Sequence, residues 1–240
     1  MREIIDLNKN EVENIIGLTS NIYGFLARGY LKEVDEDYFK KIKNILPVFQ
    51  HLESCSGDEN LSIGVRKLES YFVGIADIQK EIEKQSTMFT TLFLNVSPDD
   101  SIKHIHPFES VYLSPDRLVM QDQRDEVEEF YSRYGLGVID GFREPEDHIA
   151  AELSFLSKLN ELILADLVND NHEATLNKLK GQQEFMEQHL LKWVHIMCAE
   201  LKEACGEGFY NILAELTIGY IRTNYKFMLS FIDYLNEFKF

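Results

Sequence analysis

The residues best placed for chemistry in this sequence are Asp147 and His148, which stand side by side at the start of a helical pattern. An acid beside a histidine can work as a general acid–base pair or contribute to a metal site. No serine or cysteine nucleophile adjoins them in the sequence, and the pair alone makes neither a catalytic triad nor a metal site. The competing interpretation is structural. Carboxylates at a helix start accept hydrogen bonds from free backbone N–H groups, and the histidine is then exposed.

Other motifs fall short of a functional site. Residues 135–137 (Gly-Leu-Gly) begin like a dinucleotide-binding loop but lack its third glycine. His172 and Glu173 begin like a zinc-protease helix, but Leu176 stands where the second histidine belongs. His104 and His106 lack the further ligands of a four-coordinate metal site. We therefore expect no catalytic residue and no metal.

The net charge of the chain limits the kinds of partner that it can bind. The 240 residues include 41 Asp and Glu against 24 Lys and Arg, a net charge of −17. Such a surface repels nucleic acids and anionic lipids and favours a basic partner. No apolar run reaches the length of a transmembrane helix, and the N-terminus does not resemble a secretory signal. The three cysteines form an odd, sparse set typical of a reducing compartment, so we expect a cytoplasmic protein.

Helical periodicity dominates the sequence, and it predicts an all-α fold of about eight to ten helices in a single domain over residues 1–240. Five prolines and 13 glycines are too few for an all-β fold. Pro47 is expected to kink or split the second helix. The expected helices cover residues 11–28, 35–53, 61–82, 88–96, 115–134, 149–167, 176–201 and 209–235.

Glycines and a proline gather between two helical stretches, at residues 135–147. We expect a hinge there, between an N-terminal helical half (1–134) and a C-terminal one (148–240). In the second half, Trp193 is expected in the core with a partner for its indole N–H. Cys198 and Cys205 lie seven residues apart on one helix face and are expected to be small core residues.

Three segments, taken in their order along the chain, resemble segments of a known protein family. They are Glu-Ser-Val-Tyr-Leu-Ser from residue 109 with Met-Gln at 120–121, the stretch 144–156 in which Pro-Glu-Asp-His leads into a helix, and Phe-Met-Glu-Gln-His-Leu from residue 185. Together they resemble the TorD/DmsD/NarJ family of molybdoenzyme assembly chaperones, over about residues 109–220. The first hundred residues fit mainly by helical pattern and length. The signature positions in this sequence are Glu109, Tyr112, Gln121, Glu152, Leu153, His189 and Trp193.

The resemblance implies an all-α, cytoplasmic, non-catalytic protein. Members of that family bind the twin-arginine signal peptide of a molybdopterin-dependent reductase subunit, hold the apoenzyme until its cofactor is inserted, and so delay export. Pro145, Asp147 and His148 match the family's hinge motif, which is implicated in peptide binding, and Glu144 and Glu146 make this hinge unusually acidic. By the same resemblance we expect no cofactor beyond weak guanine-nucleotide binding, and either a monomer or a domain-swapped dimer.

A mechanism for peptide binding follows from charge. Arginine prefers bidentate pairing with carboxylates, so we expect acidic residues to form the rim of an apolar groove near the hinge. A pKa of His148 near neutrality would make peptide release pH-sensitive. Besides the acidic hinge, the expected rim residues are Asp122, Asp125, Glu126, Glu128 and Glu129.

Three alternatives remain open at this point. The chain is an assembly chaperone for a nitrate-reductase-type catalytic subunit that is not exported through a signal peptide, a helical nucleotide-hydrolysing enzyme that uses Asp147 and His148, or a structural subunit of a larger complex. The sequence does not name the client reductase.

Overall fold

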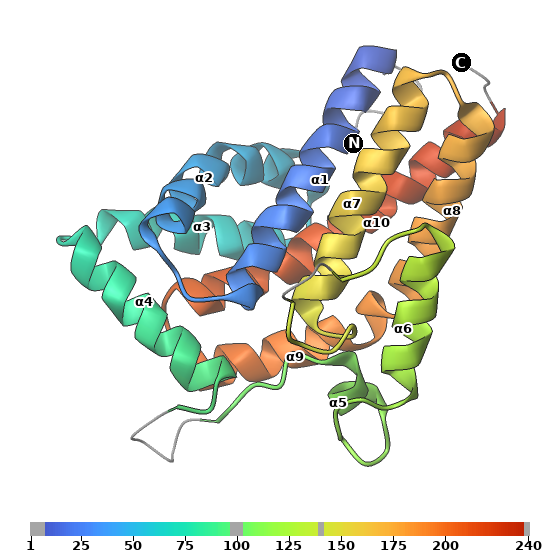
Figure 1. The fold of residues 1–240 in the computed structure, drawn as a ribbon. Coiled ribbons are helices and arrows are strands. Elements are labelled where there is room, and N and C mark those ends of the chain that lie inside the picture. Colours follow the sequence, from blue (N-terminus) through green and yellow to red (C-terminus); the bar gives the residue numbers. More distant parts are fainter. Residues whose placement is uncertain (1–7, 97–102, 139–141, 238–240) are drawn as a thin grey trace. The chain divides into compact units, whose positions relative to one another are not determined.

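Ten helices and no strand occur in the residues described by the structure, a computed structural model: 8–96, 103–138 and 142–237 (Figure 1). The all-α class expected from periodicity is confirmed. Within these residues, no helix is both long and apolar enough to cross a bilayer. The helices are α1 (Lys9–Leu31), α2 (Glu36–Ser56), α3 (Glu59–Val73), α4 (Ile78–Phe93), α5 (Glu109–Leu113), α6 (Asp122–Arg133), α7 (Ile149–Val168), α8 (His172–Gln188), α9 (Leu190–Cys205) and α10 (Phe209–Glu237).

Aspartate caps fix where three of the helices begin. The side chains of Asp35, Asp58 and Asp77 each accept a hydrogen bond from the backbone N–H three residues later, at 2.8, 3.2 and 3.2 Å. An N-cap of this kind satisfies a donor that the helix itself leaves unpaired. The cap at Asp77 explains why the single helix expected over residues 61–82 is two helices, α3 and α4.

Several other helix limits differ from the expected ones. The short helix expected at residues 88–96 is the end of α4, and α2 runs through Pro47 without being split. The helix expected over residues 115–134 begins only at Asp122. Before it, Arg117 and Met120 have positive φ angles of 52° and 57°, which are incompatible with a right-handed helix.

The pattern over residues 176–201 also covers two helices. His189 separates α8 from α9, and its backbone angles (φ −121°, ψ −93°) are not helical. The apolar period continues across the break because residues on both sides are buried, so periodicity alone could not locate it.

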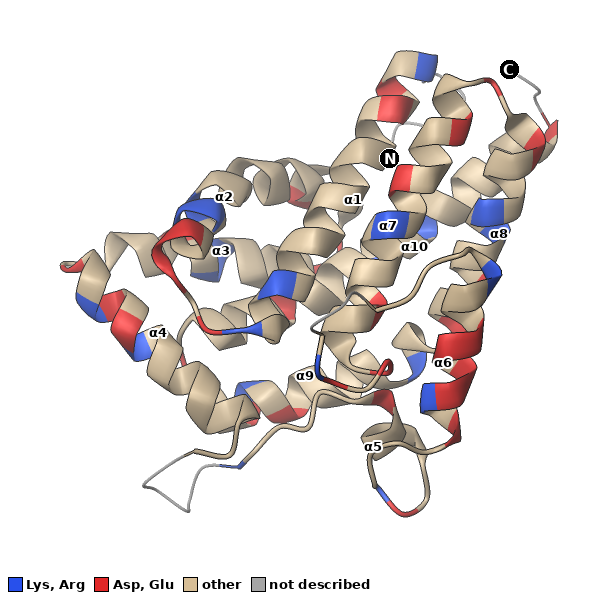
Figure 2. Ribbon diagram, in the orientation of Figure 1, with Lys and Arg blue, Asp and Glu red and all other residues tan. Residues whose placement is uncertain are grey.

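The surplus of acidic residues is pronounced on α6 (Figure 2). Its 12 residues include five carboxylates and two arginines. Val127, Phe130 and Tyr131 form its buried face, whereas all five carboxylates are exposed.

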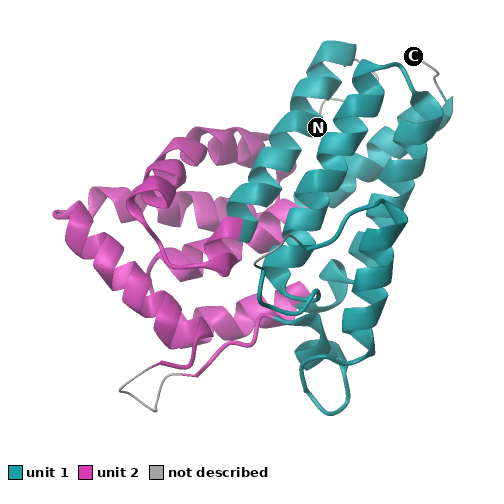
Figure 3. Ribbon diagram, in the orientation of Figure 1, with its two compact units in different colours: residues 1–27, 108–193, 223–240 teal, residues 28–107, 194–222 magenta. Residues whose placement is uncertain are grey.

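The chain forms two compact units, and each is assembled from separate stretches of sequence (Figure 3). Unit 1 comprises residues 1–27, 108–193 and 223–240, and unit 2 comprises residues 28–107 and 194–222. Each unit therefore takes chain from both of the expected halves, 1–134 and 148–240. A hinge at residues 135–147 stays a prediction, and residues 139–141 within it lie outside the described residues.

Unit 1 brings α1 together with the C-terminal part of α10. The hydroxyl of Tyr23 on α1 donates a hydrogen bond of 2.8 Å to Asn224 on α10. Around the middle of the unit, the rings of Phe130, Phe155 and Phe185 pack together with centroids 4.7 to 6.0 Å apart. These residues come from α6, α7 and α8, so one aromatic cluster holds the three helices together.

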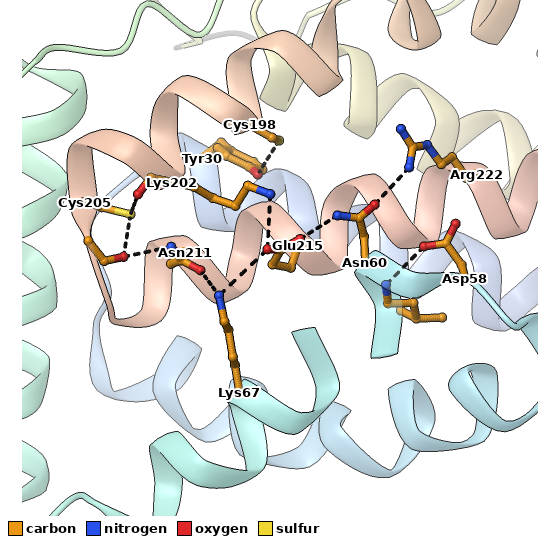
Figure 4. A network of polar contacts seen from close by, with 12 residues as sticks. Tyr30, Asp58, Asn60, Lys67, Cys198, Lys202, Cys205, Asn211, Glu215 and Arg222 are labelled. Atoms are coloured by element: carbon orange, nitrogen blue, oxygen red, sulfur yellow. Dashed lines mark hydrogen bonds and ion pairs between the residues drawn. The ribbon is translucent and has the colours of Figure 1, made fainter. Parts of the chain in front are cut away.

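Unit 2 contains a buried carboxylate with several partners (Figure 4). Glu215 on α10 accepts a hydrogen bond from Asn60 Nδ2 at 2.7 Å, and its Oε1 lies 3.1 Å from Lys202 Nζ and 3.8 Å from Lys67 Nζ. A buried charge is tolerated when it is paired in this way. Cys198 is buried nearby, as expected, and its sulfur lies 3.8 Å from the hydroxyl of Tyr30.

Candidate functional site

Asp147, the first candidate for chemistry, is fully buried and holds the short helix α5. Its carboxylate accepts a hydrogen bond of 2.9 Å from the backbone N–H of Ser110, and its carbonyl accepts one of 3.0 Å from Glu109 N–H. The residue before α5, Phe108, has no side-chain oxygen that could cap the helix. Asp147 supplies that cap from 37 residues away, so its role here is to position α5.

His148 is the N-cap residue of α7 and is also buried. Its Nδ1 accepts a hydrogen bond of 3.0 Å from the backbone N–H of Ala150, so the proton of the neutral ring is on Nε2. Phe108 and Phe142 pack edge-on against the ring. Burial lowers the pKa of His148 to about 3.

These contacts correct two expectations. The expectation of an exposed histidine beside carboxylates that cap its helix is wrong, because His148 itself caps α7 and is buried. The expectation of a pKa near neutrality for His148 is wrong as well, since burial lowers this pKa far below pH 6.

The acidic hinge residues are tied to α6. The Nε of Arg124 donates to the side chain of Glu146, and the hydroxyl of Tyr131 donates to the Glu146 carbonyl at 3.0 Å. Pro145 and Glu146 are half-buried, whereas Glu144 is exposed. Of the five residues expected to bind peptide, Glu144 is therefore the one that presents its side chain freely to solvent.

Most signature residues meet in one buried cluster within unit 1. Glu109 on α5 pairs with His189 Nδ1 at 2.9 Å. Glu152 on α7 accepts a hydrogen bond of 3.4 Å from the indole N–H of Trp193, and Tyr112 stacks on the same indole with ring centroids 5.6 Å apart. The partner expected for the Trp193 N–H is thus a carboxyl group 41 residues earlier in the chain.

The two remaining signature residues differ in their placement. Leu153 is fully buried on α7, next in sequence to Glu152. Gln121 is half-buried just before α6, and its side-chain amide donates a hydrogen bond of 3.0 Å to the carbonyl of Val119. This hydrogen bond ties Gln121 to the loop before α6.

Burial governs the ionisation of the cluster. Burial raises the pKa of Glu109, and the hydrogen bond with His189 opposes that rise. Burial raises the pKa of Glu152 well above its usual value, and the nearby charges of Glu109 and Asp147 raise it further. A carboxyl group in such surroundings holds its proton to a higher pH than an exposed one does.

The cluster has no exposed reactive group. Glu109, Asp147, Glu152, His189 and Trp193 are all buried, so a substrate cannot reach them in this conformation. Within the described residues, no group of three or more His, Cys, Asp or Glu side chains is arranged to hold a metal ion. The arrangement is that of a polar clamp, which holds α5 against α7 and the α8–α9 junction.

Two features near the site were missed by sequence reasoning. Arg124 neutralises the hinge carboxylate of Glu146, although its acidic neighbours in the sequence gave no sign of that partner. Leu118 falls within the helix expected over residues 115–134, but it lies in the loop before α6 and is exposed. Ser114-Pro115-Asp116 is a turn signal that could have revealed the loop.

Comparison with known proteins identifies the family. The family described as Nitrate reductase delta subunit matches residues 58–199, more than half of the chain. A Chaperone protein TorD from Vibrio cholerae is 27% identical over 222 residues, covering 92% of this chain and 93% of its own length. Another, from Vibrio atlanticus, is 23% identical over 209 residues, covering 87% and 94%. These relatives are named as chaperones and not as enzymes, and the chain belongs to the Nitrate reductase delta subunit family, a family of TorD-like maturation chaperones.

Proposed function

We propose that this protein is a cytoplasmic chaperone for the catalytic-subunit precursor of a molybdopterin-dependent oxidoreductase. In this role it binds the twin-arginine signal peptide of the precursor, holds the apoenzyme while the cofactor is inserted, and delays export. The observation that carries the proposal is the similarity along 92% of the chain to proteins named as TorD chaperones.

The charge of the protein supports a basic ligand. A twin-arginine signal peptide has a basic end followed by an apolar segment. The net charge of −17 attracts such a peptide from a distance. The carboxylates of α6 are exposed, so arginines of a peptide can reach them. The exposed side chain of Glu144 adds to this surface.

A direct test is titration of a synthetic twin-arginine signal peptide into the full-length protein. We expect saturable binding that weakens as salt rises, because salt screens exposed charges. Peptides in which both arginines are replaced by lysine, or both by glutamine, separate bidentate pairing from charge alone. The changes are made in the peptide because Asp147→Ala would act on α5 instead. Equal binding of all three peptides would contradict the charge argument.

A second candidate function is favoured by the description of the matching family. A chaperone of the nitrate-reductase type would assist a catalytic subunit that carries no exported signal peptide. Pull-down of a client with and without its signal peptide separates the two. Loss of binding on removal of the peptide supports the first function, and undiminished binding supports the second.

Nucleotide hydrolysis, the enzymatic alternative, has little support. Asp147 and His148 are buried and are already engaged in capping α5 and α7. Neither side chain can contact a nucleotide without unfolding a helix start.

A further inference from the structure

Three consecutive apolar side chains are exposed in the loop between α5 and α6. Leu118 is 57% exposed, Val119 41% and Met120 63%. Single exposed apolar residues are common on protein surfaces, but contiguous ones mark sites of interaction. Arg117, just before this group, and Met120, its last member, have positive φ angles, and such backbone conformations are costly for residues other than glycine.

An acidic stripe begins two residues after this apolar loop. Asp122, Asp125, Glu126 and Glu129 are spaced by three, four and seven positions along α6, so they lie on one face of the helix. All four are exposed. At 1.5 Å per residue the stripe is about 10 Å long. The opposite face of α6 packs into unit 1 through Val127, Phe130 and Tyr131.

We propose that the apolar loop (residues 118–120) and the acidic stripe of α6 together form the docking surface for the signal peptide; this inference rests on the proposed function. The arginines pair with the stripe, and the apolar segment of the peptide covers the loop. The order of the two patches along the chain matches a ligand with a basic end joined to an apolar stretch. Both patches belong to unit 1.

The two patches contribute differently to binding. Exposed ion pairs are individually weak and are screened by salt, so the stripe mainly sets the association rate and the salt dependence. Burial of apolar side chains is less sensitive to salt, so the loop sets most of the affinity that remains at high salt. Two arginines of α6 already pair with its acidic residues: Arg124 with Asp125 and Glu128, and Arg133 with Glu129. These pairs leave the loop a larger share of the affinity.

The test uses variants with matched controls. Leu118→Ser removes an apolar side chain that is 57% exposed, and Ile78→Ser removes one that is 58% exposed in unit 2. We expect peptide binding to weaken about tenfold in Leu118→Ser and to stay unchanged in Ile78→Ser. Thermal unfolding of both variants is measured to confirm that each remains folded.

The stripe is tested with a double substitution. Glu126→Gln with Glu129→Gln should weaken binding about two- to tenfold at low salt, and the difference should vanish at high salt. The control is Glu69→Gln with Glu83→Gln, which removes the same charge from exposed positions of unit 2. It should leave binding unchanged.

The outcomes separate this inference from the proposed function. If the unaltered protein does not bind the peptide, both fail. If it binds and the loop and stripe variants bind as well as it does, the docking surface is wrong and the proposed function stands. Equal losses of peptide binding in the unit 2 control variants would show a general effect of charge or stability. That result would also overturn the proposed docking surface.

Discussion

The carboxyl group of Glu152 gives the sharpest test of the buried cluster. It is fully buried on α7, next to the indole of Trp193. Burial and the nearby charges of Glu109 and Asp147 raise its pKa well above the usual value, so the folded protein holds this proton to a higher pH than the unfolded chain does. Glutamine has nearly the same shape as the protonated acid and never ionises. We therefore expect Glu152→Gln to fold normally.

The expected effect depends on pH. In the unfolded chain Glu152 releases its proton above about pH 4.3, whereas the folded protein retains it. The unfolded state of the original protein is thus favoured progressively as the pH rises, until the pKa in the folded state is reached. The variant lacks this penalty. Between the pKa of Glu152 in the unfolded chain and its pKa in the folded protein, the variant's advantage in free energy of unfolding should grow by about 1.4 kcal/mol per pH unit.

Urea unfolding followed by circular dichroism at several pH values measures this difference. At pH 3 the variant and the original protein should have similar stability, because both side chains are then neutral in both states. Glu215→Gln is the matched control: this buried carboxylate is paired with Lys67 and Lys202, so its loss should destabilise the protein by about 1–3 kcal/mol. If Glu152→Gln also lowers the stability at pH 7, the carboxyl group is an ionised partner in the cluster and the reasoning fails.

Three further predictions concern the other buried contacts. Asp147→Ala should lower the free energy of unfolding by about 1–2 kcal/mol through loss of the α5 cap, while Asp147→Asn, which keeps an acceptor, should cost less in the same urea titration. The ring protons of His148 should show no NMR titration between pH 5 and 8, because the pKa is about 3; a midpoint near 6.5 would show that the ring is solvated. The lowered pKa also means that stability from this residue is lost as the pH falls below about 6.5. Gly219→Ala should destabilise unit 2, because a Cβ there would lie 2.4 Å from a backbone nitrogen of α3. Gly17→Ala should instead stabilise α1 by about 0.5–1 kcal/mol, because the nearest atom to its added Cβ is 3.6 Å away. Thermal unfolding measures both changes, and a shift of the opposite sign in either variant would contradict the prediction.

Local sequence patterns predicted the long helices well. The helix expected over residues 149–167 is α7 (Ile149–Val168), and the one expected over 209–235 is α10. In both cases an apolar face recurs with the helical period and no capping residue interrupts it. The break at His189 could not be predicted in this way, since apolar residues continue at helical spacing on both sides of it.

The candidate site could be predicted only in part. The resemblance identified Glu109, Glu152, His189 and Trp193, and the structure brings these residues together. It did not say that they are buried or which atoms they contact, because their partners lie 41 and 80 residues away. Asp147 shows the same limit: a helix cap was expected, but the helix it caps precedes it in the chain. Periodicity reports burial along one element, and it carries no information on contacts between distant elements.

The assembly of unit 1 from three separate stretches affects how the protein is made. The third of these stretches carries the side chain of Asn224, which binds Tyr23 across 201 residues. All the residues between Tyr23 and Asn224 are therefore synthesised before α1 can find this partner. Contacts between such distant residues also slow folding. Unit 1 is thus incomplete until α10 has been synthesised.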